Sequence, residues 1–166
     1  GKNLNIDSQN QNLSNQQSGT AGGLIAQNEL SIKNVQQLNN QQGFIGANTS
    51  IDLQARQVQN QKGQIVSSQN LSIQTSGIAG EINNQEGKIA AQGNMQLHTA
   101  KLNNSAISAE GSQIIAAKDL QINADQLLNT NTFSTAAQGI DAENIQIYTQ
   151  QLDNQQGAIR ASDHST

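Results

Sequence analysis

Residues 58–73 read VQNQKGQIVSSQNLSI, and most of the chain is a variation on this stretch. An apolar residue, Val58, is followed by Asn60 and Gly63, and the stretch ends in the alternating triplet LSI. Alternation of apolar and polar residues indicates a β-strand, because successive side chains on a strand point to opposite faces. No window of the chain keeps the three- and four-residue spacing of an amphipathic helix.

The same elements recur along the whole chain. Seven apolar-x-apolar pairs follow one another at intervals of 20 to 26 residues, and they are Leu4/Ile6, Leu30/Ile32, Ile51/Leu53, Leu71/Ile73, Met95/Leu97, Leu120/Ile122 and Ile145/Ile147. After each pair comes another apolar residue with an Asn two places on, and these are Asn15, Asn40, Asn60, Asn84, Asn104, Asn129 and Asn154. In four repeats a Gly stands three residues beyond the Asn, at Gly43, Gly63, Gly87 and Gly157. An Ile follows two places after each of these glycines, so one repeat reads as three short strands separated by bends.

A single repeat is too short to bury a core, but stacked repeats bury one between them. Equivalent strands in successive repeats would run parallel, and their connections should be right-handed. The sequence therefore predicts an all-β, right-handed parallel β-helix of about seven coils, forming one unit over residues 1–166. Neither end resembles a cap, so we expect a segment of a longer filament whose open strand edges allow end-to-end self-association.

The spacing that recurs from repeat to repeat gives the Asn and Gly positions expected structural roles. Asn tolerates left-handed backbone at a bend, and its amide both donates and accepts, so a column of Asn side chains can bond along the rod. The Gly that follows is expected to allow a tight bend through a positive φ.

Three departures from the repeat predict loops. Residues 74–81 add length before Ile82, and residues 105–113 leave open whether Ile107 or Ile114 takes the first strand position. Insertions in solenoids map to loops, and such loops sometimes form binding faces.

The third departure, residues 129–139, lacks the usual Gly and carries Phe133, one of two Phe residues in the chain. An aromatic residue on an irregular loop is a candidate contact for a partner. We therefore considered Thr132, Phe133 and Ser134 as a binding loop.

Composition limits the function classes. The formal net charge is −4 with 8 Lys and Arg, which disfavours a nucleic-acid surface because that needs a clustered basic face. Asn and Gln together account for 50 of 166 residues, which is also typical of disordered tracts, but the apolar residues are periodic rather than scattered. Cys and Pro are absent, so no disulfide can form early and every backbone N–H is available to the sheet.

No cluster of residues with recognisable chemistry emerges. The two His residues, His98 and His164, are far apart, so neither a zinc site nor another cofactor site is expected. The Asp and Glu residues fall at unrelated repeat positions, and we expect no catalytic residues and no enzyme activity. The alternative is a β-helix that binds or cleaves carbohydrate, since residues one coil apart come close in space.

Residues 38–47 (LNNQQGFIGA) and 152–161 (LDNQQGAIRA) resemble the repeat of filamentous haemagglutinins and of contact-dependent growth-inhibition toxins. The resemblance covers nearly the whole chain as seven degenerate copies. It implies a very large exoprotein of Gram-negative bacteria, exported through a dedicated two-partner outer-membrane transporter and displayed at the cell surface. In that family the repeats build an adhesive filament or a toxin stalk that projects a distal module toward a receptor or glycan on a target cell.

Overall fold

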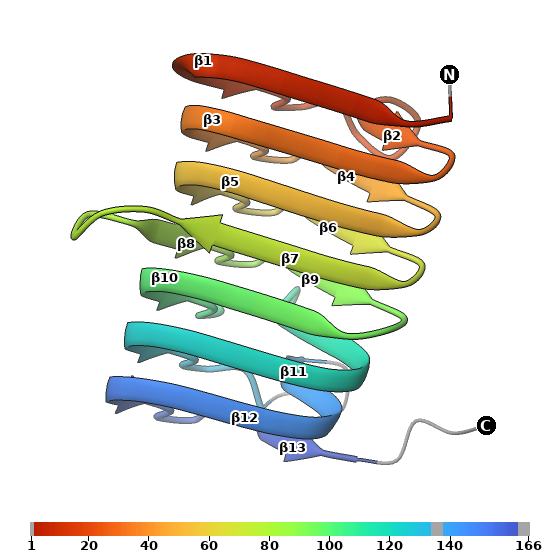
Figure 1. Ribbon diagram of the computed structural model, residues 1–166. Coiled ribbons are helices and arrows are strands. Elements are labelled where there is room, and N and C mark those ends of the chain that lie inside the picture. Colours follow the sequence, from red (N-terminus) through yellow and green to blue (C-terminus); the bar gives the residue numbers. More distant parts are fainter. Residues whose placement is uncertain (1, 134–137, 163–166) are drawn as a thin grey trace.

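The computed structural model describes residues 2–133 and 138–162. These residues form thirteen strands and no helix, joined in one parallel sheet that winds into a solenoid (Figure 1). The strands are β1 (Leu4–Ser14), β2 (Leu24–Ala26), β3 (Glu29–Asn39), β4 (Phe44–Ala47), β5 (Ser50–Gln59), β6 (Gln64–Ser67), β7 (Asn70–Thr75), β8 (Glu81–Asn83), β9 (Lys88–Ala91), β10 (Met95–Asn103), β11 (Gln113–Leu128), β12 (Gly139–Asp153) and β13 (Ile159–Ala161). The prediction of an all-β parallel β-helix is confirmed. A membrane-spanning helix is not found in these two ranges.

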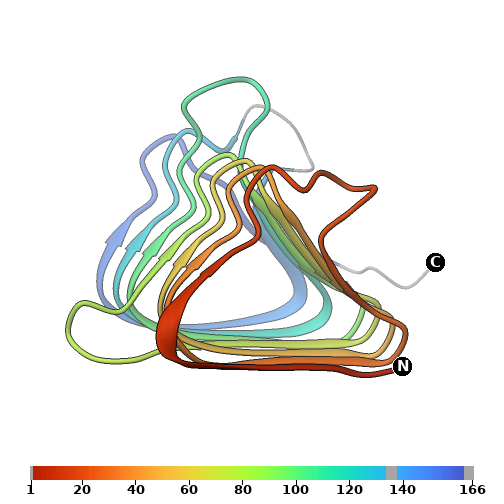
Figure 2. The same ribbon diagram turned by 90° about the horizontal axis from the view of Figure 1, so that it is seen from above.

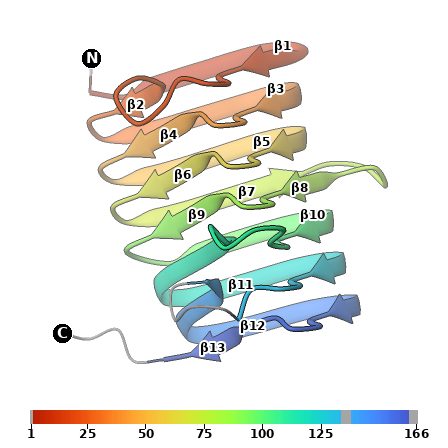
Figure 3. The same ribbon diagram turned by 180° about the vertical axis from the view of Figure 1, so that it is seen from behind.

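The rod has three faces, and the chain runs clockwise as it recedes from the N-terminal end, which makes the helix right-handed (Figure 2). The first face holds β2, β4, β6 and β9, the starts of β11 and β12, and β13 (Figure 3). The second face holds the first parts of β1, β3, β5 and β10, with β7 and the middle of β11 and β12. The third face holds the remaining parts of these long strands, with β8.

The number of turns is slightly lower than predicted. The seven apolar-x-apolar pairs lie in β1, β3, β5, β7, β10, β11 and β12, which stack in that order. Seven stacked strands are separated by six intervals, so the chain makes about six turns rather than seven. The sequence pattern counts strands, whereas a turn is the path from one strand to its equivalent.

Like side chains stack on like inside the rod. On the first face Ile65 pairs in register with Ile45 above and Ile89 below, and all three are fully buried. Burying one such side chain contributes roughly 1.5–3 kcal/mol, so the columns are the main source of stability. In the outermost levels the equivalent residues are only half-buried, because each has a neighbouring coil on one side only; examples are Leu4, Ile6, Ile145 and Ile159.

The structure settles the departures from the repeat. Residues 76–80 bulge between β7 and β8 (Figure 1). Ile78 in this loop is completely exposed. Ile114 takes the first-face position, in register with Ile89, whereas Ile107 is exposed in the loop before β11. The choice follows from register, because only Ile114 lies within the strand that pairs with β9.

Candidate functional site

The seven repeated Asn residues form one ladder through the interior, along the bend between the third and first faces. In each of the first six, Nδ2 donates a hydrogen bond to Oδ1 of the Asn in the next coil, at 2.7–2.8 Å. The ladder runs through Asn15, Asn40, Asn60, Asn84, Asn104, Asn129 and Asn154. All the bonds point the same way, so every inner amide both donates and accepts.

The ladder also ties the third face to the first. Asn40 Nδ2 reaches the carbonyl oxygen of Gln64 at 3.1 Å, Asn60 reaches that of Lys88 at 3.2 Å, and Asn84 reaches that of Gln113 at 3.0 Å. These carbonyls begin the first-face strands of the following coil. The Asn side chain therefore satisfies backbone groups at a bend where the sheet is interrupted.

The backbone at this bend differs from the expectation. Neither the ladder Asn residues nor Gly43, Gly63, Gly87 and Gly157 have positive φ. The left-handed residue is instead the one two places after the Asn, with φ between 51° and 59°, and these residues are Gln17, Gln42, Lys62, Glu86, Asn131 and Gln156. The four turns that end in Gly are closed by a bond such as Gly43 N–H to the Asn40 carbonyl at 3.0 Å, which resembles a type II turn with positive φ at its third residue.

The four glycines are needed because a side chain would not fit at these positions, and not because the backbone requires a positive φ. A Cβ at Gly63 would overlap the carbonyl oxygen of Asn40 and would lie 2.7 Å from Oδ1 of Asn60. Gly43, Gly87 and Gly157 meet the same two groups in their own coils. The backbone has to approach the Asn ladder closely, and only a residue without a side chain permits this.

In two of the three coils that lack this Gly, a side-chain hydroxyl accepts the hydrogen bond that a backbone carbonyl accepts in the regular coils. In a regular coil Gln64 N–H donates to the Gly43 carbonyl at 2.9 Å. Where the chain leaves the rod, Phe44 N–H donates instead to Ser18 Oγ at 3.0 Å, and Ala158 N–H donates to Thr132 Oγ1 at 3.0 Å. These two residues were not predicted from the sequence, although a Ser or Thr three places after the Asn marks both of them.

The loop formed by residues 105–112 is anchored at a buried carboxylate. Glu86 N–H donates to Ser112 Oγ at 2.6 Å, and Ser112 Oγ donates in turn to the Ser105 carbonyl at 2.7 Å. The Glu86 side chain is 2% exposed and lies 3.3 Å from Lys62 Nζ. Hydrogen bonding from Ser108, followed by Lys62, holds the pKa of Glu86 below its ordinary value against the opposing effect of burial.

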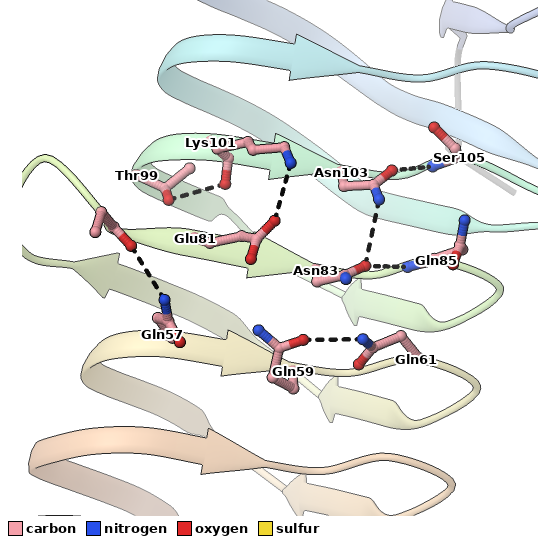
Figure 4. Close-up of polar contacts among 11 residues, drawn as sticks. Gln57, Gln59, Gln61, Glu81, Asn83, Gln85, Thr99, Lys101, Asn103 and Ser105 are labelled. Carbon is pink, nitrogen blue, oxygen red and sulfur yellow. Dashed lines mark hydrogen bonds and ion pairs between the residues drawn. The ribbon is translucent and has the colours of Figure 1, made fainter.

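The outer side of the third face is a lattice of polar side chains (Figure 4). Asn103 Nδ2 donates to Asn83 Oδ1 at 3.4 Å, and Lys101 pairs with Glu81 at 3.3 Å. Further amide bonds join Gln37 to Gln57 and Gln61 to Gln59. Neutral amides that bond between and within coils give the rod a polar surface with few charges.

The proposed binding loop is only partly at the surface. Thr132 is fully buried and its hydroxyl is used within the rod, so it cannot contact a partner. Phe133 is 62% exposed, and Ser134 lies outside the described residues. Gln138, beyond that gap, is buried and donates from Nε2 to the Ala109 carbonyl at 2.9 Å, which joins this connection to the loop of the preceding coil.

A different part of the surface forms a hollow of about 700 Å³, which we call the corner groove. It lies at the corner between the second and third faces, where its lining comes mainly from β10, β11 and β12, and Gly77 and Ile78 of the 76–80 loop also line it. Its polar and aromatic lining includes His98, Asn123, Asp125, Tyr148 and Gln150. Asp125 is the one carboxylate among its lining residues, whereas glycoside hydrolysis ordinarily uses a pair.

Within the described ranges no three His, Cys, Asp or Glu side chains gather in a way that could hold a metal ion. No protein-family model, no curated protein and no solved structure matches the chain. Its function therefore has to be inferred from the rod and its surface.

Proposed function

We propose that this chain is a structural and adhesive rod segment of a large secreted exoprotein on the surface of a Gram-negative bacterium. It would act as part of a filamentous haemagglutinin-like adhesin or of the stalk of a contact-dependent growth-inhibition toxin. Its role is to hold a distal module away from the producing cell and so to mediate attachment to another cell. The resemblance of the repeat supports this family.

The observation that carries the mechanical role is the continuity of bonding along the axis. Every coil is joined to the next by parallel strand pairing on its faces and by the interior Asn ladder. Each turn adds about 4.8 Å to the rod, so six turns span roughly 29 Å. A long reach therefore needs many repeats, which suits a very large exoprotein.

The composition supports export through a two-partner outer-membrane transporter. A chain without Cys cannot form a disulfide before it crosses the membrane. Coils that fold one after another outside the cell would prevent the exported chain from moving back through the transporter. The proposed partners are this transporter and a receptor or glycan on the target cell; no nucleic acid is proposed.

The test deletes one coil, because the register places the two ends that are joined at equivalent positions of neighbouring coils. Asn40 and Asn60 occupy equivalent positions and bond to each other at 2.7 Å, so removing residues 41–60 joins one coil to its neighbour in register. In producing cells we expect this deletion to preserve surface display, measured by antibody binding to intact cells. We expect the double substitution Asn60→Asp with Gly63→Val to reduce display, because it blocks stacking. A chain found only inside the cells would contradict the proposal.

A further inference from the structure

We propose that the corner groove is a binding site for a neutral glycan chain, an inference that rests on the adhesive function proposed above. The groove is built by two columns of outward-facing side chains on consecutive coils. His98, Asn123 and Tyr148 form one column, in register across β10, β11 and β12. Asp125 and Gln150 belong to the second column and bond to each other at 3.2 Å.

The first column offers hydrogen-bonding groups that the rod itself does not use. The side chains of His98, Asn123 and Tyr148 have no hydrogen bond to any other described residue. Elsewhere outward polar groups are often paired, as in the lattice of the third face. Unused donors and acceptors that converge on a hollow are the features that orient a polar ligand.

The groove also holds the single Tyr of a chain that has no Trp and only two Phe. Tyr148 is 58% exposed, so its ring is accessible to a ligand. A sugar ring presents a face of C–H bonds that packs on an aromatic ring, and a rim of hydroxyls that both donate and accept. An aromatic platform beside amide and carboxylate groups matches both parts of that surface.

Charge favours a neutral chain over an anionic one. The groove lining contains Asp125 but no Lys or Arg. Lys101 lines the neighbouring hollow, and it is paired with Glu81 at 3.3 Å. A sulfated or phosphorylated polymer needs cations that are free to neutralise it, and this groove supplies none among its lining residues.

An extended peptide fits the groove less well. β10 is paired with β7 and β11 on its two sides, and β11 is paired there with β10 and β12. A peptide therefore cannot add itself as a further strand to β10 or β11, which is the usual way an extended peptide binds a sheet. A glycan needs no strand edge, because it is bound through side chains.

The dimensions set the length of ligand that these three coils can contact. The first column covers three coils, and two coil spacings of about 4.8 Å give roughly 10 Å. A sugar unit in an extended chain is about as long as one coil spacing, so about three units would lie along the column. Ile78 limits the groove at the end formed by the 76–80 loop.

The experiment measures binding of neutral oligosaccharides of two to six units to the intact chain by calorimetry, after a screen on an array that also carries sulfated and sialylated glycans. We expect binding of a neutral oligosaccharide, with affinity that stops rising at about three or four units. Tyr148→Ala and Asn123→Ala should each weaken binding about tenfold or more, with the melting temperature unchanged. Gln54→Ala, in the same column but outside the groove, should bind as the unaltered chain does.

Three results would overturn the inference. They are the absence of binding to every neutral oligosaccharide, equal binding by Tyr148→Ala, and a preference for sulfated glycans that weakens with salt. If instead a protein from the target cell binds and Tyr148→Ala abolishes that binding while no glycan binds, the ligand class is wrong. Melting temperature and surface display report on the proposed rod independently, so failure of glycan binding would not be confused with failure of the rod.

Discussion

Asn60 donates from Nδ2 to Oδ1 of Asn84 at 2.7 Å, although the two residues are 24 positions apart in the chain. Asn60 also accepts from Asn40 at 2.7 Å. The side chain is fully buried, so no water can replace a lost partner without entering the rod. The ladder is therefore a place where single substitutions should be costly.

Replacing Asn60 by Ala should destabilise the chain by about 2–4 kcal/mol, because it leaves Asn40 Nδ2 and Asn84 Oδ1 without their ladder partners. Urea unfolding followed by circular dichroism measures the loss. Asn48→Ala is the matched control, since Asn48 is exposed and outside the ladder, and it should change stability by less than about 0.5 kcal/mol. Equal effects of the two substitutions would argue against the ladder.

Gly63→Ala should be more damaging than Gly77→Ala. A Cβ at Gly63 meets a backbone carbonyl and the Asn60 amide, whereas a Cβ at Gly77 meets nothing within 4 Å. Gly77 has φ +80°, so its substitution should cost about 1 kcal/mol through backbone strain alone. Thermal melts of both variants distinguish the two causes, and a larger loss for Gly77→Ala would contradict the close-approach explanation.

Gln42→Gly should stabilise the chain slightly, by up to about 1 kcal/mol, because Gln42 is held at φ 54° and is exposed. Its N–H bond to the Gln61 carbonyl at 3.1 Å would be kept. The neighbouring Gln41→Gly should instead destabilise. Gln41 does not have positive φ, so a Gly there relieves no strain in the folded state and only raises the conformational entropy of the unfolded chain. The same sign for both variants in urea unfolding would contradict this assignment.

Thr132→Val should destabilise by about 1–2 kcal/mol, because the isosteric change removes the acceptor for Ala158 N–H. Thr132→Ser keeps the hydroxyl and should lose less. Hydrogen exchange at the Ala158 amide provides a local readout and should speed up only in the Val variant. Unchanged exchange there would mean that the hydroxyl does not hold the following coil.

The lowered pKa of Glu86 gives a pH dependence with a defined sign. A carboxyl whose pKa is lower in the folded state contributes stability above its unfolded value of about 4.5, and that contribution is lost as pH falls through the folded value. Glu86→Gln should therefore be less stable than the unaltered chain at pH 7, and the difference should shrink below pH 4.5. Thermal melts between pH 3 and pH 7 test this.

Glu143→Gln is the control for the pH series, because Glu143 is exposed. It should shift the melting temperature little at any pH in that range. A difference for Glu86→Gln that grows toward pH 3 would have the wrong sign and would show that the Ser108 and Lys62 contacts do not stabilise the carboxylate.

Side-chain periodicity was enough to predict the fold class, because stacked parallel strands satisfy both the alternation within a strand and the constant order of strands within a short repeat. The same pattern could not choose between Ile107 and Ile114, since both are apolar and correctly spaced. Pairing with β9 and β12 made the choice, and those strands come from the preceding and following coils.

The sequence by itself determined the repeat, the inward columns and the identity of the Asn residues in the ladder, because each depends on residue type at a regular spacing. Only the tertiary structure decided why the glycines are needed, since the obstructing carbonyl belongs to the previous coil. It also buried Thr132 and brought His98, Asn123 and Tyr148 into one groove. The physical reason is the same in each case: these contacts join residues on separate coils, and their distance depends on how the coils stack.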